Sequence, residues 1–385
     1  MKFTYISPSE VPSRAANSVH VVMQCDALVQ VGAELTIYVK RTMPKAEKLL
    51  WAIQSSYGID FSKARLVSVW SGSRRGSNLR IAVIALWDLF SNPWPDIILS
   101  RNLYASFIIA VIVKRPLLFE THQLELGIRK YIQCKIMSCS SVTTVVISKQ
   151  LKKYLIKHHK RAPSKTLVLH DAAPECGNPV SKSMRYSSLM EIYPEAKGTW
   201  QGVCGYFGHL YAGRGVEIIE LMAKARPGVL FLLFGGNEAD VEIRRRSSEY
   251  DNVHYVGHVS FPLAQKVMRS VDVLLMPYQE SVSIGVSGHD TARWMSPMKM
   301  FEYMATGVPI ISSDLPVLCE VLRNGHNALL VPPSNSQLWI TALDEILSDD
   351  QLAGSISEQA YQDYLMKHTW NQRAHRLIRA GKELQ

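Results

Sequence analysis

The sequence lacks the cysteine patterns of disulfide frameworks and of metal centres. Zinc sites and disulfide scaffolds place their cysteines at short, regular spacings. This chain of 385 residues has no C-x-x-C pair and no cysteine–histidine cluster at zinc spacing. Its six cysteines are scattered: Cys25, Cys134, Cys139, Cys176, Cys204 and Cys319. We therefore expect reduced, mostly buried thiols and no metal site.

The sequence also lacks a secretory leader and a long apolar run. The first ten residues, MKFTYISPSE, contain neither an apolar core nor a small-residue cleavage site. The longest apolar stretch, 103–113, ends at Lys114 and Arg115. It is shorter than the roughly 20 residues that a helix needs to cross a bilayer. We expect a cytoplasmic protein, free or peripheral at the inner membrane face.

Negative charge is scarce in the first half. Residues 1–172 hold 24 lysine and arginine residues against 10 aspartate and glutamate residues, whereas the whole chain has a net charge of +10. A basic domain attracts nucleic acid, anionic lipid headgroups or a lipid-linked diphosphate. The basic residues are spread over many elements and no nucleic-acid-binding motif accompanies them. We therefore expect an anionic membrane surface as the partner; a non-enzymatic nucleic-acid-binding protein stays as an alternative.

One basic run, 149–161 (KQLKKYLIKHHKR), is the candidate for membrane contact. Apolar residues recur in it at helical spacing, as in interfacial amphipathic helices. They are Leu151, Tyr154, Leu155 and Ile156. The alternative interpretation is a stripe that faces the protein core.

β-rich runs alternate with helical segments along the whole chain, which predicts parallel sheets covered by helices. The expected strands are 3–6, 35–39, 97–100, 117–120, 144–147, 166–169, 203–207, 229–234, 253–256, 273–276 and 308–311. The length exceeds what one core organises. We expect two Rossmann-like α/β domains whose parallel sheets face a central cleft. Their predicted limits are 1–172 and 202–365, with a linker at 173–201 and a helix at 366–385 that packs back on the N-terminal domain.

The segment 296–333 carries the strongest motif, beginning SPMKMFEYMATGVPII. Ser296 and Pro297, followed by Met298, read as a helix start. Backbone N–H groups there, together with Lys299, would bind a diphosphate. Glu302 lies one turn further, where a carboxylate can accept two ribose hydroxyls. An exposed i, i+3 ion pair on an ordinary helix is the alternative.

This segment closely resembles the donor-binding signature of family 4 (group 1) glycosyltransferases of the GT-B fold, in the SPxKxFEYM branch. The resemblance implies a retaining hexosyltransferase that uses a UDP- or GDP-linked sugar. Glu302 matches the second glutamate of the family's Glu, seven residues, Glu motif. The first falls at Trp294, so Asp290 in the preceding loop is the candidate that grips a sugar hydroxyl.

A glycine-rich segment, GYFGHLYAGRG at 205–215, has the strand–loop–helix form of a phosphate cradle. Gly208 allows a close backbone turn, and Arg214 opens the next helix. In the family, an arginine and a lysine of this loop grip the donor diphosphate, at the positions of His209 and Arg214. Arg214 keeps a permanent charge and a two-pronged geometry for phosphate.

Further site residues follow from the same resemblance. The segment 252–260 resembles the family's nucleobase contact, which suggests Val259 as a base contact, and Tyr278 follows a strand near the same pocket. His122, just beyond the strand at 117–120, matches a family histidine that touches the donor sugar and is implicated in catalysis.

The acceptor-side candidates lie in the first half. Asn17 and Ser18, in a segment that resembles the family's first loop and helix, are expected to cap that helix. Arg101 follows the strand at 97–100 and is the candidate contact for an acceptor phosphate.

The resemblance implies no cofactor beyond the sugar nucleotide, and the missing D-x-D motif agrees with metal independence. The expected acceptor is a saccharide, linked to polyprenyl diphosphate, in surface-polysaccharide synthesis. A nucleotide-sugar epimerase or hydrolase of the same fold stays as an alternative. A nicotinamide oxidoreductase is disfavoured because SPSEVPSRAAN, rather than a glycine fingerprint, follows the first strand.

Overall fold

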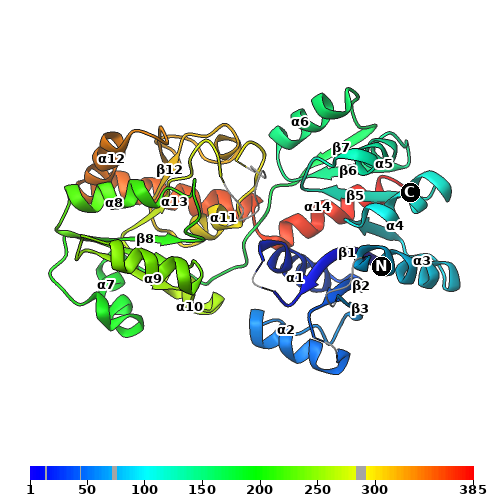
Figure 1. Cartoon of the computed structure of the whole chain (residues 1–385), viewed down its shortest axis with the longest axis horizontal. Helices are drawn as coiled ribbons and strands as arrows, with labels where there is room; N and C mark the ends of the chain where they lie inside the picture. The colour runs from blue at the N-terminus through cyan, green and yellow to red at the C-terminus, as the bar shows by residue number, and fades with distance from the viewer. Residues whose placement is uncertain (14, 44, 72–75, 283–291) are drawn as a thin grey trace. The chain divides into compact units, whose positions relative to one another are not determined.

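The protein is described by a computed structural model that covers residues 1–13, 15–43, 45–71, 76–282 and 292–385. These residues form two compact units, one of Met1–Asp171 with Trp370–Gln385 and one of Ala172–Thr369. Each unit holds one parallel sheet with helices packed against it (Figure 1). The expected class, two Rossmann-like α/β domains, is confirmed.

The sheet of unit 1 has the strand order β3-β2-β1-β4-β5-β6-β7. Its strands are β1 (Lys2–Val11), β2 (Glu34–Arg41), β3 (Arg65–Trp70), β4 (Ile97–Ser100), β5 (Leu117–Thr121), β6 (Val142–Val146) and β7 (Lys165–Val168). Every residue of β4, β5 and β6 is buried. That pattern fits central strands of a parallel sheet, which are covered on both faces.

Helices connect the strands of unit 1, and α14 belongs to this unit although it follows unit 2 in the chain. α14 packs against α1, β4 and β5. The helical segments are α1 (Ala16–Gln30), η1 (Ala46–Lys48), α2 (Leu49–Tyr57), α3 (Ser77–Ser91), α4 (Leu103–Phe107), η2 (Ile108–Ile112), α5 (Gly127–Met137), α6 (Lys149–His159) and α14 (Trp370–Lys382).

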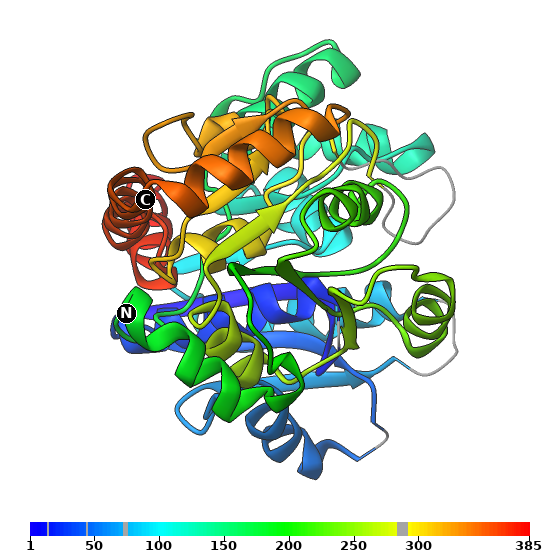
Figure 2. The same ribbon diagram turned by 90° about the vertical axis from the view of Figure 1, so that its left-hand side faces the viewer.

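The sheet of unit 2 has the order β10-β9-β8-β11-β12-β13. Its strands are β8 (Gly202–Phe207), β9 (Val229–Phe234), β10 (Val253–Gly257), β11 (Val273–Met276), β12 (Ile310–Ser313) and β13 (Leu329–Val331). Its helical segments are α7 (Lys182–Ile192), η3 (Pro194–Ala196), α8 (Val216–Ala225), α9 (Glu238–Ser247), α10 (Phe261–Met268), α11 (Met298–Met304), η4 (Leu318–Glu320), α12 (Ser336–Ser348) and α13 (Asp350–Lys367). Helices cover both faces of this sheet (Figure 2). Separate apolar cores line the two faces, under α7, α10 and α11 on one and under α8, α9 and α12 on the other.

The segment 173–201 is not the linker that its polar composition predicts. It contains α7 and η3, and Leu189 and Ala196 are fully buried in the core of unit 2. Arg185, also buried, donates a hydrogen bond to the carbonyl oxygen of Gly307 at 3.0 Å. A few apolar anchors therefore fix a helix whose other residues are polar.

The capping expected of Asn17 and Ser18 is wrong. α1 begins at Ala16, and its N-cap, Ala15, makes no side-chain hydrogen bond. Asn17 is exposed in the first turn. The hydroxyl of Ser18 instead shares a hydrogen bond of 2.7 Å with the hydroxyl of Tyr57 and ties the helix to α2. Asn17 as an acceptor contact stays a prediction.

α6 has its apolar stripe in the core. Leu151 and Leu155 are fully buried, and Tyr154 and Ile156 are partly buried. The core-facing alternative for this basic run is therefore the correct one. No helix in the described ranges combines the length and the apolar character needed to cross a bilayer.

Candidate functional site

In unit 2 the structure brings Arg214 and Lys299 to one aromatic ring. The Cζ atom of Arg214 lies 5.2 Å, and Nζ of Lys299 lies 4.5 Å, from the ring centroid of Tyr278. Nη1 of Arg214 also donates a hydrogen bond of 3.0 Å to the Tyr278 hydroxyl. Tyr278 follows β11, Arg214 precedes α8, and Lys299 is in the first turn of α11. Two strand-to-helix connections, β8 to α8 and β11 to α11, thus build a cationic group, defined here as Arg214, Lys299 and Tyr278.

Lys299 lies between two tyrosines. Its Nζ atom is 4.2 Å from the ring centroid of Tyr206 as well as 4.5 Å from that of Tyr278, within cation–π range. Among the described residues, Nζ has no hydrogen-bond partner. Burial, followed by the charge of Arg214, lowers the pKa of Lys299 well below its ordinary value, while Glu302 opposes the shift. An anion placed here would favour the charged form of the amine.

Gly208, at the end of β8, leaves room for this ammonium. A Cβ atom at Gly208 would lie 3.2 Å from Nζ of Lys299 and 3.2 Å from the hydroxyl of Tyr206. The same glycine has a φ of +154°, and its carbonyl oxygen would be 2.2 Å from a Cβ at Gly235. The backbone of two strand ends therefore meets beside Lys299, as a phosphate cradle requires.

Glu302 lies one turn beyond Lys299 on α11. Burial raises the pKa of Glu302 to about 7, with Lys299 opposing. Near neutral pH this carboxyl group is thus divided between its charged and neutral forms. Its ionised form accepts hydrogen bonds only, which suits a pair of ribose hydroxyls.

His209 is a further candidate residue of unit 2. His209 is exposed and stacks on Tyr211, with ring centroids 4.8 Å apart. Partial burial, then the charges of Arg214 and Lys299, lowers the pKa of His209. A neutral imidazole can donate one hydrogen bond without adding to the charge. Its contact with a phosphate stays a prediction.

α11 starts where the motif predicts, directly after Ser296 and Pro297. Pro297 is the N-cap, without a side-chain hydrogen bond, and Met298 is the first helical residue. The helix is only seven residues long. The side chains of the cationic group therefore supply the main positive charge here, because the dipole of so short a helix is small.

The structure does not test the roles predicted for Val259 and Asp290. Val259, between β10 and α10, is partly buried against the core of unit 2. Its contact with a nucleobase remains a prediction. Asp290 lies outside the described residues. Its replacement of the carboxylate missing at Trp294 therefore stays a prediction.

In unit 1, Arg101 and His122 meet at the carboxyl ends of neighbouring strands. Ser100 of β4 pairs with Ile6 of β1 and with Phe119 of β5, so the residues after β4 and β5 lie at one edge of the sheet. There, Nη2 of Arg101 is 3.1 Å from Nδ1 of His122. A guanidinium only donates hydrogen bonds, so Nδ1 is the acceptor and the ring carries its proton on Nε2.

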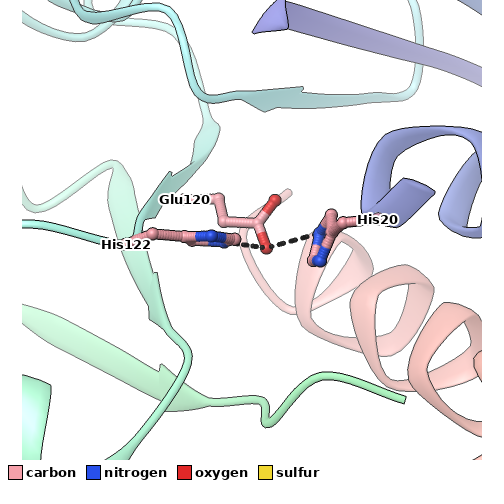
Figure 3. Close-up of side chains that lie close together, drawn as sticks. All are labelled: His20, Glu120 and His122. Carbon is pink, nitrogen blue, oxygen red and sulfur yellow. Dashed lines mark hydrogen bonds and ion pairs between the residues drawn. The ribbon is translucent and has the colours of Figure 1, made fainter. Parts of the chain in front are cut away.

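That proton points to Glu120 (Figure 3). Nε2 of His122 is 3.1 Å from Oε1 of Glu120, a fully buried carboxylate. Burial, then the charge of Arg101, lowers the pKa of His122 to about 4, and Glu120 opposes the shift. His122 is consequently a neutral imidazole of fixed tautomer at neutral pH.

Glu120 is the centre of a larger buried network from four elements. Nη2 of Arg373, on α14, donates to Oε1 of Glu120 at 2.5 Å, and Nε2 of His20, on α1, lies 3.4 Å from the same oxygen. Nδ1 of His20 is 2.8 Å from Oδ1 of Asp171. Burial alone would raise the pKa of Glu120, but Arg373 and His20 hold it well below its usual value.

His20, Glu120 and His122 place ligand-type atoms within 4.8 Å of one another. They nevertheless do not fit a metal ion. Arg373 occupies the carboxylate oxygen that both histidines face, and Arg101 occupies Nδ1 of His122. Two guanidinium charges in direct contact with the set would repel a cation. This network is an internal ion-pair cluster.

The comparisons with known proteins point to one family. Residues 202–349 match the family model of group 1 glycosyl transferases. The matched range contains Arg214, Lys299 and Glu302. The finer SPxKxFEYM branch stays a prediction.

Two curated relatives carry mannosyltransferase names. Phosphatidyl-myo-inositol mannosyltransferase of Mycolicibacterium smegmatis is 28% identical over 147 residues, which are 38% of this chain and 34% of the relative. Chitobiosyldiphosphodolichol beta-mannosyltransferase of Candida albicans is 21% identical over 238 residues, 60% of this chain and 51% of the relative. The matches thus span about a third to a half of the relatives' lengths.

A solved structure agrees over the whole chain. Sucrose-phosphate synthase from Thermosynechococcus elongatus superposes with a TM-score of 0.75 at 14% identity, covering all of this chain and 98% of the other. At that identity the likeness shows the fold alone. The fold is GT-B, as expected from the sequence.

Proposed function

We propose that the protein is a glycosyltransferase that moves a hexose-type sugar from a nucleotide-sugar donor to a saccharide acceptor. The observation that carries this proposal is the meeting of Arg214 and Lys299 on the ring of Tyr278, within the range that matches the family model. Transfer from a sugar nucleotide releases a nucleoside diphosphate. Its developing negative charge needs fixed cations at the leaving oxygens.

The chemistry of the cationic group supports this role. Arg214 offers a planar, permanently charged fork that matches phosphate geometry. Lys299 is held without a hydrogen-bond partner among the described residues, so a diphosphate oxygen would be its first. Tyr278 keeps the two cations together by accepting from Arg214 and by presenting its ring to Lys299. Glu302 would accept the ribose hydroxyls.

We propose that His122 of unit 1 contacts the donor sugar. Because Arg101 and Glu120 fix its tautomer, His122 presents a neutral ring in one orientation. A neutral imidazole beside the reacting sugar adds no positive charge that would oppose an oxocarbenium-like transition state. Arg101 remains the candidate for an acceptor phosphate.

The acceptor we propose is a lipid-linked saccharide, in the assembly of surface polysaccharide at the inner face of a membrane. The names of both curated relatives include a lipid, phosphatidyl-myo-inositol in one and diphosphodolichol in the other. The excess of lysine and arginine in residues 1–172 supports an anionic surface or diphosphate as the partner of unit 1.

We further propose transfer with retention and without a metal. The resemblance of 296–333 to the family signature supports retention, and the two cations of the cationic group supply charge that a metal would otherwise bring. Proton NMR of the product gives the anomeric configuration. Full activity in EDTA is expected, and a metal requirement would contradict the second statement.

Differential scanning fluorimetry with UDP, GDP, ADP and their sugars tests the function directly. We expect one nucleoside diphosphate to raise the melting temperature, and its sugar form to be consumed only when acceptor is present. Release of free sugar or an epimer without acceptor would favour the hydrolase or epimerase alternative. If no nucleotide raises the melting temperature while a filter-binding assay retains nucleic acid, the protein is a nucleic-acid binder.

A further inference from the structure

The outer face of α3 is apolar although it is exposed. Leu79, Val83, Trp87 and Phe90 have exposed fractions of 53%, 56%, 70% and 58%. Their spacing of four, four and three residues puts them on one side of the helix. The other side packs into unit 1 through Ile81, Ala82, Ala85, Leu86 and Leu89. An apolar helix face that is exposed in this way marks an interaction surface.

This row of four, here named the α3 stripe, continues past the helix into aromatic and cationic residues. Phe90 contacts Trp94 edge-to-face, with ring centroids 5.7 Å apart. The guanidinium of Arg115 lies 5.4 Å from the centroid of Trp94. At the other end, Nη2 of Arg80 donates to the carbonyl oxygen of Trp70, an exposed tryptophan. The stripe is therefore bounded at both ends by a tryptophan and an arginine.

Acidic residues are few along this part of the chain. Between residues 76 and 116 the sequence holds two acidic residues, Asp88 and Asp96. Asp88 is buried and binds Arg65 at 2.7 Å, and Asp96 accepts from the backbone nitrogen of Lys2 at 2.8 Å. The surface around the α3 stripe is thus apolar, with a cation at each end and one exposed carboxylate, Asp96, close to Trp94.

We propose that α3 lies in the headgroup layer of an anionic lipid bilayer, with the α3 stripe against the acyl chains and Arg80 and Arg115 on lipid phosphates. Apolar side chains flanked by tryptophan and arginine match the layered polarity of a membrane interface. The cations add attraction to anionic lipid. This lipid contact does not depend on transferase activity. It extends the proposed function by locating the membrane contact on α3.

The charge of unit 1 selects a bilayer over a second copy of the chain. Two α3 stripes in contact would bring the basic residues 1–172 of two molecules together, at a cost in repulsion. An anionic bilayer has the opposite sign. α6 is the lesser candidate in unit 1 because Leu151 and Leu155 are fully buried and Tyr154 and Ile156 are partly buried.

Flotation of the full chain with vesicles tests the proposal. The vesicles contain phosphatidylcholine alone or phosphatidylcholine with phosphatidylglycerol. The test variant is Val83→Asn with Trp87→Ser, and the control is Trp51→Ser on α2, because Trp51 is as exposed as Trp87, at 70%. We expect the test variant to bind phosphatidylglycerol vesicles at least about tenfold more weakly, since two apolar side chains no longer insert. The control should bind like the wild type.

A second pair of measurements separates insertion from adsorption. Arg80→Gln with Arg115→Gln should lower binding to phosphatidylglycerol vesicles and leave binding to phosphatidylcholine unchanged. Lipids with brominated acyl chains should quench the tryptophan fluorescence of the wild type more than that of the test variant. Melting temperatures should agree among all variants, because the replaced side chains are exposed.

Three results would overturn the proposal. They are equal loss of binding in the Trp51→Ser control, no binding of the wild type to either vesicle, and a dimer in lipid-free buffer that the test variant converts to a monomer. The nucleotide-induced shift in melting temperature is measured without vesicles. A failure of α3 to bind lipid is therefore distinct from a failure of the proposed transferase function.

Discussion

The two units each hold a cluster of buried charge, and the clusters are built in opposite ways. In unit 1 the carboxylate of Glu120 is contacted by Arg373, His20 and His122, so acid and base neutralise each other within the protein. In unit 2 the ammonium of Lys299 faces two tyrosine rings and has no hydrogen-bond partner among the described residues.

Under the proposed function, the charge of Glu120 is structural and that of Lys299 serves binding. Burial disfavours the charged form of Lys299, and Glu302 offsets this only in part, so the folded protein gains from an anion bound there. Glu120 has a partner at each carboxylate oxygen without a ligand, although Nη1 of Arg101 has no hydrogen-bond partner among the described residues. Under the proposed function, the diphosphate would be the partner of Lys299. Substitutions in one cluster at a time separate the two roles.

Arg373→Met should have the largest effect, and it should act on stability. The substitution leaves the fully buried Glu120 with the two histidines and the Tyr5 hydroxyl but without its arginine, and the free energy of unfolding of unit 1 should fall by about 3–5 kcal/mol. Urea denaturation measures it. The control is Arg379→Met on the same helix, whose exposed ion pair with Glu383 contributes little. An equal loss in both variants would show that Glu120 does not depend on Arg373.

Lys299→Met should act on binding instead. Loss of a charge-assisted contact with a diphosphate weakens nucleoside diphosphate binding by about 100-fold. The melting temperature without ligand should stay the same or rise, because the low pKa of Lys299 records an unfavourable environment for its charge. Lys266→Met, an exposed lysine of the same unit, is the matched control. An unchanged nucleotide shift in Lys299→Met would refute the assignment of the cationic group.

Substitutions of Tyr278 separate its hydroxyl contact with Arg214 from its ring contact with Lys299. Tyr278→Phe keeps the ring beside Lys299 but removes the hydroxyl that accepts from Arg214, so affinity for the nucleoside diphosphate should fall by roughly tenfold. Tyr278→Leu removes both contacts and should weaken binding further. Isothermal titration calorimetry measures both variants. Equal affinities of Tyr278→Phe and wild type would mean that Arg214 holds its position without this hydrogen bond.

The smallest effect concerns pH. With its pKa raised to about 7, Glu302 is ionised above and protonated below that value, and only the ionised form is a pure acceptor for ribose hydroxyls. Affinity for the nucleoside diphosphate should fall as pH drops from 8 to 6, by several-fold. Pyrophosphate, which lacks a ribose, should show a weaker dependence. Glu302→Gln should remove the difference between the two ligands; a difference that persists would assign the ribose to another residue.

Much of the fold was readable from the sequence because buried parallel strands are continuous apolar runs. The strands β4, β9 and β11 have the limits that their sequences predict. β3 and β13 went unpredicted. β3 lies at the edge of its sheet with mostly partly buried residues, and β13 has only three residues, so neither shows a clear apolar run.

The site likewise contains residues that the sequence predicted and residues that it did not. Arg214, Lys299 and Glu302 stand in local motifs, and the resemblance of these motifs to the family signature selected them as candidates. Tyr206 was missed because a tyrosine inside a buried strand looks like a core residue. Glu120 and Arg373 are 253 residues apart, and no local pattern joins them. The carboxylate within the apolar run LLFETH was the available signal for an internal ion pair.

The place of α14 in the chain has a consequence for biosynthesis. Unit 1 is interrupted by all of Ala172–Thr369, and Arg373 lies beyond that insertion. During synthesis, all of unit 2 is therefore translated before the guanidinium that neutralises Glu120. Until α14 has been made, the surface of unit 1 beside α1 that this helix covers is exposed. A chaperone that shields this surface would bind the incomplete chain.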